Sequence, residues 1–258
     1  MGQTKSRFRQ FTDEQWQRIE PLLPSNHGRQ GHPFRDNRKV VEAIAYRYRT
    51  GIPWRDLPCS SARHKHNSSR AGHRGARSNH KNRPPQDCEP AGHGIGRSRG
   101  GLTTKIHSAV DGRGRPLANV VTGGQRNDGA MLAEVLADIH VPRQGRGRPR
   151  TRPDAVIADK AYSSGTIRRQ LRGRGISAVI PEKSDTIAAR QRRGGRGGRL
   201  PKLDVDLYKG RNVVERSFAL ARQWRALATR YGKLATTYRA AVTLCAILTW
   251  LRTLGDTP

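Results

Sequence analysis

The segment from Ala62 to Gln86 divides this chain into two parts. Its sequence, ARHKHNSSRAGHRGARSNHKNRPPQ, contains no Val, Leu, Ile, Met, Phe, Tyr or Trp. A segment without large apolar side chains buries too little surface to offset the entropy that is lost when a backbone becomes ordered. Globular structure is therefore expected before this segment, within residues 11–58, and after it, from residue 96 onward.

The chain as a whole is strongly basic. It has 258 residues with Lys+Arg 50 against Asp+Glu 20, a formal net charge of +30 and a sequence pI near 11.5. This excess opposes compaction by self-repulsion and indicates a polyanionic partner, most often DNA or RNA. A GC-rich genome explains part of the arginine excess, but the arginines cluster. The longest apolar runs, such as residues 240–251, are too short to span a bilayer, so no membrane partner is expected.

Residues 11–58 predict a small helical module. Thr12 and Gln15 have the spacing of a capping box, and Gly51 is placed to end a second helix. The apolar residues expected on the buried sides of the two helices are Trp16, Ile19, Leu22, Leu23, Val40, Val41, Ile44, Ala45 and Tyr48. Two short helices with a basic connector suit a helix-turn-helix-like DNA reader, and an ordinary helical hairpin explains these residues equally well.

From Gly100 onward, strands and helices are predicted to alternate. Strands are expected at residues 102–111, 117–124, 154–162 and 176–181, the first two forming a hairpin. Helices are expected at 128–141, 163–175 and, in two segments, 206–254, whereas residues 189–202 predict a mobile basic loop. This order indicates an α/β domain with a mixed sheet.

Two acidic residues occupy informative positions. Asp159 follows the apolar run of residues 155–158, at the strand end where α/β sheets place their ligands. A loop cap, or a pair with Lys160, is the alternative explanation. Glu215 shares one helical stripe with Arg211 and Arg222. Residues in such a stripe usually form an ordinary solvent-exposed salt bridge, but they could also line a path for phosphate groups.

The spacing of the second group matches a known signature. Tyr208, Arg211, Glu215 and Arg222 are separated by two, three and six residues, as in the Y-(2)-R-(3)-E-(6)-K signature of DDE transposases, with Arg in the final Lys position. With GRSRGGLTTKIH, DGRGRPL, TGGQRNDG, ADKAYSS and GRNVVER, this spacing makes the chain resemble bacterial insertion-sequence transposases of the IS-five type. The resemblance covers residues 11–58 and 92–252.

The resemblance implies a fold and a set of site residues. It implies a helical, DNA-binding N-terminal region at 11–58 and a ribonuclease-H-like domain at 96–254, with a mixed sheet and flanking helices. In the family, two aspartates and a glutamate hold Mg²⁺ (or Mn²⁺); Asp159 matches the second aspartate and Glu215 the glutamate, as catalytic residues and metal ligands. The residues expected to contact DNA are Tyr208, Arg211, Arg222, Lys160, Arg97, Arg99 and Lys105.

The resemblance also implies partners and a location. The expected partners are the terminal inverted repeats of a transposon and its target DNA. A homodimer that forms on DNA is a further possibility. Three cysteines in no paired pattern, with no visible signal peptide, favour a reducing compartment. Together with the family, this predicts a cytoplasmic, nucleoid-associated bacterial protein.

The first family aspartate has no clear counterpart in this chain. Between Pro58 and Gly100 the only acids are Asp87 and Glu89, and neither follows an apolar run; Asn67 gives only a weak alignment. Residues 59–95 could be a metal site, a disordered basic arm or the product of a deletion or frameshift. A metal site would use His64, His66, His73, His80, His93, Cys59 and Cys88, whose spacing is unlike that of zinc modules. We favour a deletion or frameshift that removed the opening strand of the sheet with its aspartate.

Three function classes follow. The first is a transposase of an insertion sequence, catalytically impaired by the loss of the first aspartate. The second is a non-catalytic DNA-binding remnant with sequence-specific or general affinity. An RNA-binding protein is disfavoured, because aromatic residues make up only 5% of the chain and leave few surfaces for base stacking.

Overall fold

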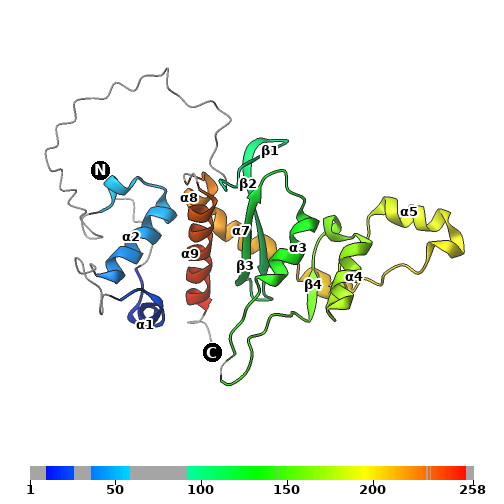
Figure 1. Cartoon of the computed structure of the whole chain (residues 1–258), viewed down its shortest axis with the longest axis horizontal. Helices are drawn as coiled ribbons and strands as arrows, with labels where there is room; N and C mark the ends of the chain where they lie inside the picture. The colour runs from blue at the N-terminus through cyan, green and yellow to red at the C-terminus, as the bar shows by residue number, and fades with distance from the viewer. Residues whose placement is uncertain are drawn as a thin grey trace, which may run out of the picture.

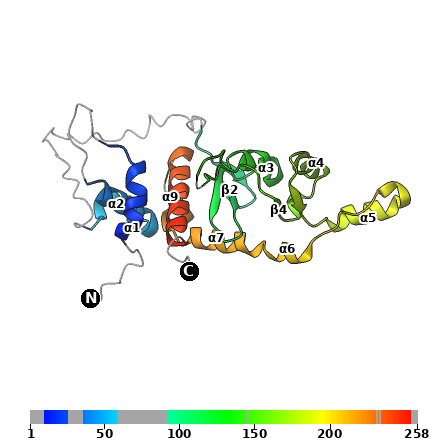
Figure 2. The same cartoon turned by 90° about the horizontal axis from the view of Figure 1, so that it is seen from below.

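The computed structural model describes residues 10–25, 36–58, 92–143, 145–230, 232 and 234–253. The molecule is elongated, and its layers follow one another along the long axis (Figures 1 and 2). The elements in chain order are α1 (Asp13–Ile19), η1 (Glu20–Leu22), α2 (Asn37–Thr50), η2 (Trp54–Asp56), β1 (Gly96–Ser98), β2 (Gly101–Val110), β3 (Pro116–Gly123), α3 (Asp128–Ala137), β4 (Ala155–Ile157), η4 (Lys160–Tyr162), α4 (Gly165–Gly173), β5 (Ser177–Val179), α5 (Ser184–Arg192), η5 (Gly194–Gly197), α6 (Val205–Lys209), α7 (Asn212–Arg222), α8 (Arg225–Ala228) and α9 (Ala235–Thr253). The mixed α/β character that the sequence predicts is confirmed.

The hairpin formed by β2 and β3 is the central layer. The two strands pair antiparallel from Thr104 with Gly123 to Val110 with Pro116. Helix α9 covers one face of this sheet and α3 covers the other (Figures 1 and 2). The register explains the two faces, because paired residues point the same way and neighbours along a strand alternate. Ile106 and Val121 therefore pack toward α9, whereas Val120 packs toward α3.

The turn of this hairpin is fixed by its own charged residues. The Asp111 carboxylate accepts hydrogen bonds from the backbone N–H groups of Arg113 and Arg115, both at 2.9 Å. The Arg115 side chain returns to Asp111 at 2.6 Å and lies 4.1 Å from the ring centroid of Trp250 in α9. The Trp250 indole donates to the carbonyl of Pro116 at 2.8 Å. The DGRGRPL segment thus attaches the hairpin to α9 by a cation–π contact and a hydrogen bond.

The N-terminal helices share a hydrophobic core with the C-terminal helices. The buried members of this core are Phe11, Trp16, Ile19, Ala45, Trp224, Leu227, Tyr238, Ala241, Val242, Cys245, Leu248 and Leu251. Glu42 is buried where the chain enters α1, and its carboxylate accepts a hydrogen bond from the backbone N–H of Phe11 at 3.2 Å. Helix α2 is largely enclosed, leaving Lys39 and Val40 exposed.

The predicted start of α1 and the predicted end of α2 are confirmed, with two corrections to the residues expected on the buried sides. Thr12 and Gln15 form the capping box, and Gly51 ends α2 at φ 77°. Leu22, however, is 83% exposed instead of buried. Helix α1 stops at Ile19 because Pro21 has no N–H to continue the ladder and its ring opposes the preceding turn. Val40, predicted on the buried side of α2, is also exposed.

A second core lies on the other face of the hairpin. Its buried residues are Ala118, Val120, Met131, Val135, Leu136, Ile139, Ile167, Leu171, Ile176 and Ile180. Helix α3 joins the hairpin to the unit made of β4, β5 and α4 through this core. Ser164 caps α4 by accepting a hydrogen bond from the N–H of Ile167 at 3.3 Å.

Strands β4 and β5 form a separate parallel pair. Their register runs from Ala155 with Ser177 to Ile157 with Val179, and no strand among the described residues joins β4 to β2. The predicted strand at 154–162 is shorter than expected, and β4 is half-buried instead of buried. The physical reason is that β4 has a strand neighbour on one edge alone within the described part of the chain. The following residues, Lys160–Tyr162, form the short helix η4.

The remaining predicted segments differ in detail. Helix α3 ends at Ala137, earlier than the predicted residue 141, and the C-terminal tail forms four helices instead of two. Helix α5 extends through Arg192, so the first residues of the predicted loop at 189–202 are helical; the mobility of the rest stays a prediction. Helices α5 and η5 project beyond the rest of the molecule in both views (Figures 1 and 2). Within the described residues, no helix has both the length and the apolar character needed to cross a membrane.

The second core predicts a stability difference between two leucines. Leu171 in α4 is 1% exposed, whereas Leu220 in α7 is 45% exposed. Leu171→Ala should lower the free energy of unfolding by about 2–5 kcal/mol, because it removes buried apolar surface and leaves a cavity. Leu220→Ala, measured by the same urea titration, should cost less than about 1 kcal/mol. Equal losses in the two variants would contradict the assignment of Leu171 to the core.

Candidate functional site

Asp159 lies directly after β4, where the chain turns into η4. Its carboxylate caps this turn by accepting a hydrogen bond from the N–H of Ala161 at 2.9 Å. The side chain is 46% exposed, so one part of the carboxylate serves the turn while another part faces outward. The loop-cap explanation of Asp159 is therefore correct, and it leaves room for a second interaction.

That second interaction is with Arg211, at the junction of α6 and α7. One guanidinium nitrogen, Nη1, donates to Oε1 of Glu215 at 2.7 Å, and Nη2 lies 4.0 Å from Oδ2 of Asp159. Asp159 and Glu215, which are far apart in the sequence, thus face one shared cation. The two carboxylates that the sequence singles out lie within reach of a common positive group.

The junction of α6 and α7 lies next to β4. A Cβ atom at Gly210 would lie 3.1 Å from the carbonyl oxygen of Leu207, which is a tight contact, and 3.6 Å from Cδ1 of Ile157 in β4, which is an ordinary van der Waals contact. The backbone of the GRNVVER segment therefore runs beside β4, and Arg211 lies close to Asp159.

The shared guanidinium is weakly held. The side chains of Arg211, Asp159 and Glu215 are 34%, 46% and 59% exposed. Ion pairs this open to solvent typically contribute less than about 1 kcal/mol, because water screens them and long side chains lose entropy. A competing cation at the carboxylates, or a competing anion at Arg211, can therefore displace the pair at little cost.

The donor atoms suit a hard divalent cation. Mg²⁺ prefers carboxylate oxygens and is commonly held by one or two carboxylates together with water and substrate phosphates. Asp159 and Glu215 supply two such carboxylates. In the described part of the chain, no cluster of three or more His, Cys, Asp or Glu side chains could hold a metal ion. The site thus fits the metal by donor type, with two protein ligands.

The other residues expected to contact DNA near this pair lie on the same elements or next to them. Lys160 follows Asp159 and is exposed, Tyr208 is half-buried in α6, and Arg222 is exposed at the end of α7. Tyr208 and Arg222 are on separate helices, because α6 ends at Lys209 and α7 begins at Asn212. Within the described residues, no ion pair joins Lys160 or Arg222 to a carboxylate.

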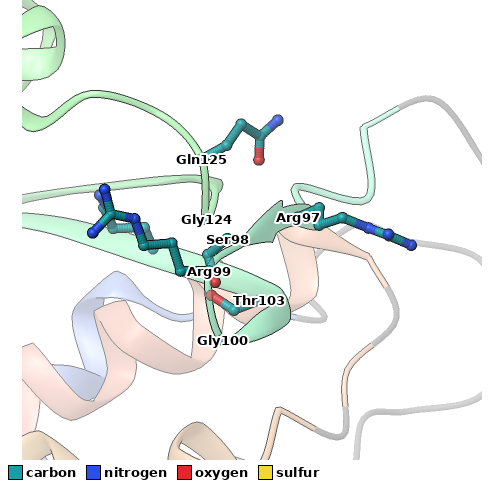
Figure 3. Close-up of a pocket in the computed structure, with 8 residues that line it drawn as sticks. Arg97, Ser98, Arg99, Gly100, Thr103, Gly124 and Gln125 are labelled. Carbon is teal, nitrogen blue, oxygen red and sulfur yellow. The ribbon is translucent and has the colours of Figure 1, made fainter.

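Arg97, Arg99 and Lys105 gather at a different place. They line an open pocket of about 590 Å³ where β1 turns into β2, together with Ser98, Gly100, Thr103, Gly124 and Gln125 (Figure 3). Neither Asp159 nor Glu215 is among the residues that line this pocket. The residues that the sequence grouped as one DNA surface therefore fall into two clusters.

A polar cluster that the sequence reasoning missed lies between these two places. Asp128, the first residue of α3, is 3.1 Å from Nζ of Lys105 and 3.4 Å from Nδ1 of His107. His107 is 5% exposed, and its Nε2 lies 2.8 Å from the hydroxyl of Thr122. Burial lowers the pKa of His107, although the charge of Asp128 acts in the opposite direction. The signal was present in the sequence, because His107 falls on the inner face of an alternating strand.

Tyr162 connects this cluster to the turn after β4. Burial raises the pKa of Tyr162 to about 12, and the charges of Asp128 and Asp159 add to that effect. The phenol is therefore protonated at neutral pH. The backbone confirms the proximity, since a Cβ atom at Gly129 would lie 3.5 Å from the carbonyl oxygen of Ala161. The start of α3 and the Asp159 turn pack against each other.

Several sequence predictions fall outside the described residues. These concern the first carboxylate and the metal site within residues 59–91, including Asn67, His64, His66, His73, His80, Cys59, Cys88, Asp87 and Glu89. His93 is described, and its Nδ1 accepts from the N–H of Ile95 at 2.9 Å.

Comparisons with known proteins place the chain among transposases. The family described as "Transposase DDE domain" matches residues 72–250, and the family described as "Putative transposase of IS4/5 family" matches residues 11–79. A "Putative transposase for insertion sequence element IS402" of Burkholderia cepacia is 36% identical over 57% of this chain and 63% of its own length. A "Putative transposase for insertion sequence element IS6501" of Brucella ovis is 28% identical over 58% of this chain and 100% of its own length. The chain thus spans less than two thirds of the first relative, and no solved structure matches significantly.

The buried histidine predicts a pH dependence of stability. Because the folded state holds the pKa of His107 below its ordinary value of about 6.5, the unfolded chain binds the proton more tightly. The contribution to stability is complete above about pH 6.5 and is lost as the pH falls below it. Urea titrations at pH about 7.5 and about 5.5 should show a larger loss for the wild type than for His107→Gln, which keeps a polar side chain but does not titrate. The same loss in both proteins would show that other groups cause it.

Proposed function

Because the chain belongs to the transposase DDE domain family, we propose that it is a DNA-binding transposase of an insertion sequence whose strand-cleavage activity is impaired. Asp159 and Glu215 are the metal ligands and catalytic carboxylates in this proposal. The DNA partners are the terminal inverted repeats of the element and its target. Location at the nucleoid in the bacterial cytoplasm follows from that partner.

The observation that carries the proposal is the shared contact of Arg211. Two carboxylates from distant parts of the sequence would repel each other unless a cation lay near both. The guanidinium of Arg211 meets this need, at 2.7 Å from Glu215 and 4.0 Å from Asp159. Arg38 bridges Asp13 and Glu42 in a similar way, but only the pair at Arg211 includes a carboxylate at the end of a strand in an α/β fold.

The residues of the site have separate roles toward a phosphodiester substrate. When bound, divalent cations activate the attacking oxygen and neutralise charge on the leaving oxygen. Asp159 and Glu215 supply the oxygen ligands, and either Mg²⁺ or Mn²⁺ suits them. Arg211 must then leave the carboxylates, and a DNA phosphate is the natural new partner for its guanidinium. Lys160, Tyr208 and Arg222 would hold the neighbouring backbone by charge and hydrogen bonding.

The proposed impairment of strand cleavage follows from the lack of a clear counterpart to the family's first aspartate. The family uses three carboxylates, and the acids between Pro58 and Gly100 are Asp87 and Glu89, neither preceded by an apolar run. The split sheet supports the loss of an opening strand. Within the described residues, β3 pairs with residues 104–110 of β2, β1 pairs with residues 101–103 alone, and β4 has a strand on one side only. One further strand between β2 and β4 would join the two sheets into one ribonuclease-H-like sheet.

The role of residues 11–58 in DNA contact is a smaller part of the proposal. A helix-turn-helix-like reader needs an exposed helix face, and α2 exposes little beyond Lys39 and Val40. DNA contact by this region would therefore use α1 more than α2. A homodimer on DNA is compatible with the family. Binding without cleavage, as in a remnant that occupies transposon ends, is the alternative function that the high charge favours.

The carboxylate pair predicts metal binding in the absence of DNA. In a Mn²⁺ titration followed by electron paramagnetic resonance, Asp159→Asn and Glu215→Gln should each weaken binding. Arg211→Gln should strengthen binding by up to about fivefold, because the displaced ion pair contributes less than about 1 kcal/mol. Asp138→Asn is the matched control, since Asp138 also pairs with an arginine, Arg239, at 2.6 Å. A loss in the control as large as in Asp159→Asn would refute a specific site.

Impairment predicts DNA binding without strand cleavage. The purified chain should shift a duplex carrying the terminal repeat of its own element. With Mg²⁺ or Mn²⁺ it should then cleave no more than the Asp159→Ala, Glu215→Ala double variant does. Efficient cleavage that Asp159→Ala abolishes would overturn the impairment and require a further carboxylate. Failure to bind DNA would overturn the proposed function itself.

A further inference from the structure

The sheet of this protein is interrupted between β2 and β4. Within the described residues, β3 pairs with residues 104–110 of β2 on one side, and no strand pairs with them on the other side. Strand β4 pairs with β5, and its other edge has no strand neighbour in the same part of the chain. We propose that these two open edges accept an extended apolar segment of another polypeptide, which binds between β2 and β4 as an additional strand. The proposal concerns a protein partner and therefore goes beyond the function proposed above.

The open edge of β2 selects an extended backbone. The N–H and C=O groups of a strand point alternately to its two sides, so about half of those in residues 104–110 point away from β3. In the described structure, no hydrogen bond from outside the β2–β3 pair reaches the backbone of residues 105–110. An edge of this kind presents a row of donors and acceptors at the spacing of a neighbouring strand. Addition of a strand from another chain is an established way to bind a peptide at such an edge.

Helices cover both faces of the interruption. On one face, α3 packs on β2 and on η4, the short helix that follows β4. On the other face, a Cβ atom at Gly210 would lie 3.6 Å from Cδ1 of Ile157 in β4, and one at Gly114 in the hairpin turn would lie 3.4 Å from Cγ1 of Val213 in α7. Figure 2 shows α3 on one side of the sheet and α6 with α7 on the other. An added strand would therefore lie between two helical layers.

Helix α7 has an apolar side that is only partly covered. Val213, Val214 and Phe218 are half-buried, and in the described part of the chain none of them belongs to either of the two cores. Val214 and Phe218 are four residues apart and so lie on the same side of the helix. Ile157 of β4 is also half-buried and faces this layer. Apolar side chains of an added strand would cover these residues.

The sequence indicates that the occupant comes from a different polypeptide. A strand that is buried on both faces is apolar along nearly its whole length. Residues 59–91 contain no Val, Leu, Ile, Met, Phe, Tyr or Trp, and residues 1–9 and 26–35 contain three such residues, none adjacent or alternate. A second copy has the same composition, and the net charge of +30 on each copy opposes their association. The expected occupant is an apolar segment of about five to seven residues, the usual length of a strand.

Binding of this segment would complete the sheet that carries Asp159. Strand β4 is half-buried, and its second edge would gain a neighbour. Asp159 follows β4 directly and caps the turn into η4. A strand partner would therefore stabilise the position at which Asp159 faces Arg211.

A defined peptide tests the open edges. The probe is the end-capped, fluorescein-labelled peptide KTVIVIVTK, whose lysines disfavour non-specific attraction to a basic protein. The comparison peptide carries N-methyl groups on alternate residues, which keep the side chains and remove the hydrogen-bond donors along one edge. The full chain should bind the comparison peptide at least roughly tenfold more weakly, because backbone hydrogen bonds are lost. Equal affinity for the two peptides, or no binding of either, would overturn the proposal.

Hydrogen exchange locates the bound peptide. At saturation, amides in residues 104–110 and 155–158 should exchange at least roughly tenfold more slowly than in the free protein, whereas those in residues 240–250 of α9 should change less. Binding without slower exchange at both edges would place the peptide elsewhere and overturn the proposal. Sedimentation provides a further outcome. A dimer that the peptide dissociates would identify a second copy as the occupant and make the assignment to a different polypeptide wrong.

Two substitutions in α7 form a matched pair. Phe218→Ser removes a half-buried ring from the apolar side, whereas Leu220→Ser removes a side chain that is 45% exposed. The first should weaken peptide binding by roughly fivefold to fiftyfold, because apolar contact with the added strand is lost, and the second by less than about twofold. Urea titrations without peptide show whether each variant is still folded. Equal peptide affinities of two folded variants would contradict the role of α7. These measurements use no DNA, so a failure of the strand site and a failure of the proposed function appear in different experiments.

Discussion

The structure depends on the burial of both faces of the β2–β3 hairpin. One face packs through Ile106 and Val121 against α9, and the other packs through Val120 against α3. An isolated two-stranded hairpin is marginally stable in water, so each helix layer is needed to hold it. Because α3 also packs on η4 and shares the second core with α4, the hairpin joins the N- and C-terminal helices on one side to the β4–β5 unit on the other.

The candidate site lies where this assembly is least completely packed. The parallel pair β4 and β5 has a strand on neither outer edge in the described part of the chain, and parallel pairs are normally buried within larger sheets. The guanidinium of Arg211 links Asp159 and Glu215. Open ion pairs of this kind are weak, so a competing cation or anion can displace them at little cost.

The cations that the sequence assigns to DNA contact fall into two separate regions. One surrounds the carboxylate pair, with Arg211, Lys160 and Arg222, and the other is the pocket with Arg97, Arg99 and Lys105. Between them lie Asp128, whose side chain is 40% exposed, and Tyr162, which packs against the second core. This arrangement agrees with a nucleic-acid partner for a chain of net charge +30.

Local sequence determined much of this protein. Alternation of apolar residues fixed the β2–β3 hairpin, Thr12 with Gln15 fixed the start of α1, and Gly51 fixed the end of α2, because each depends on contacts within a few residues. Family spacing also selected Asp159 and Glu215 as a pair. Tertiary structure alone decided that β4 is half-buried, that Leu22 is exposed, that α6 separates from α7, and that Asp128 joins Lys105 to His107. These features depend on which distant strand, helix or charge becomes a neighbour, and periodicity along the chain carries no information about that.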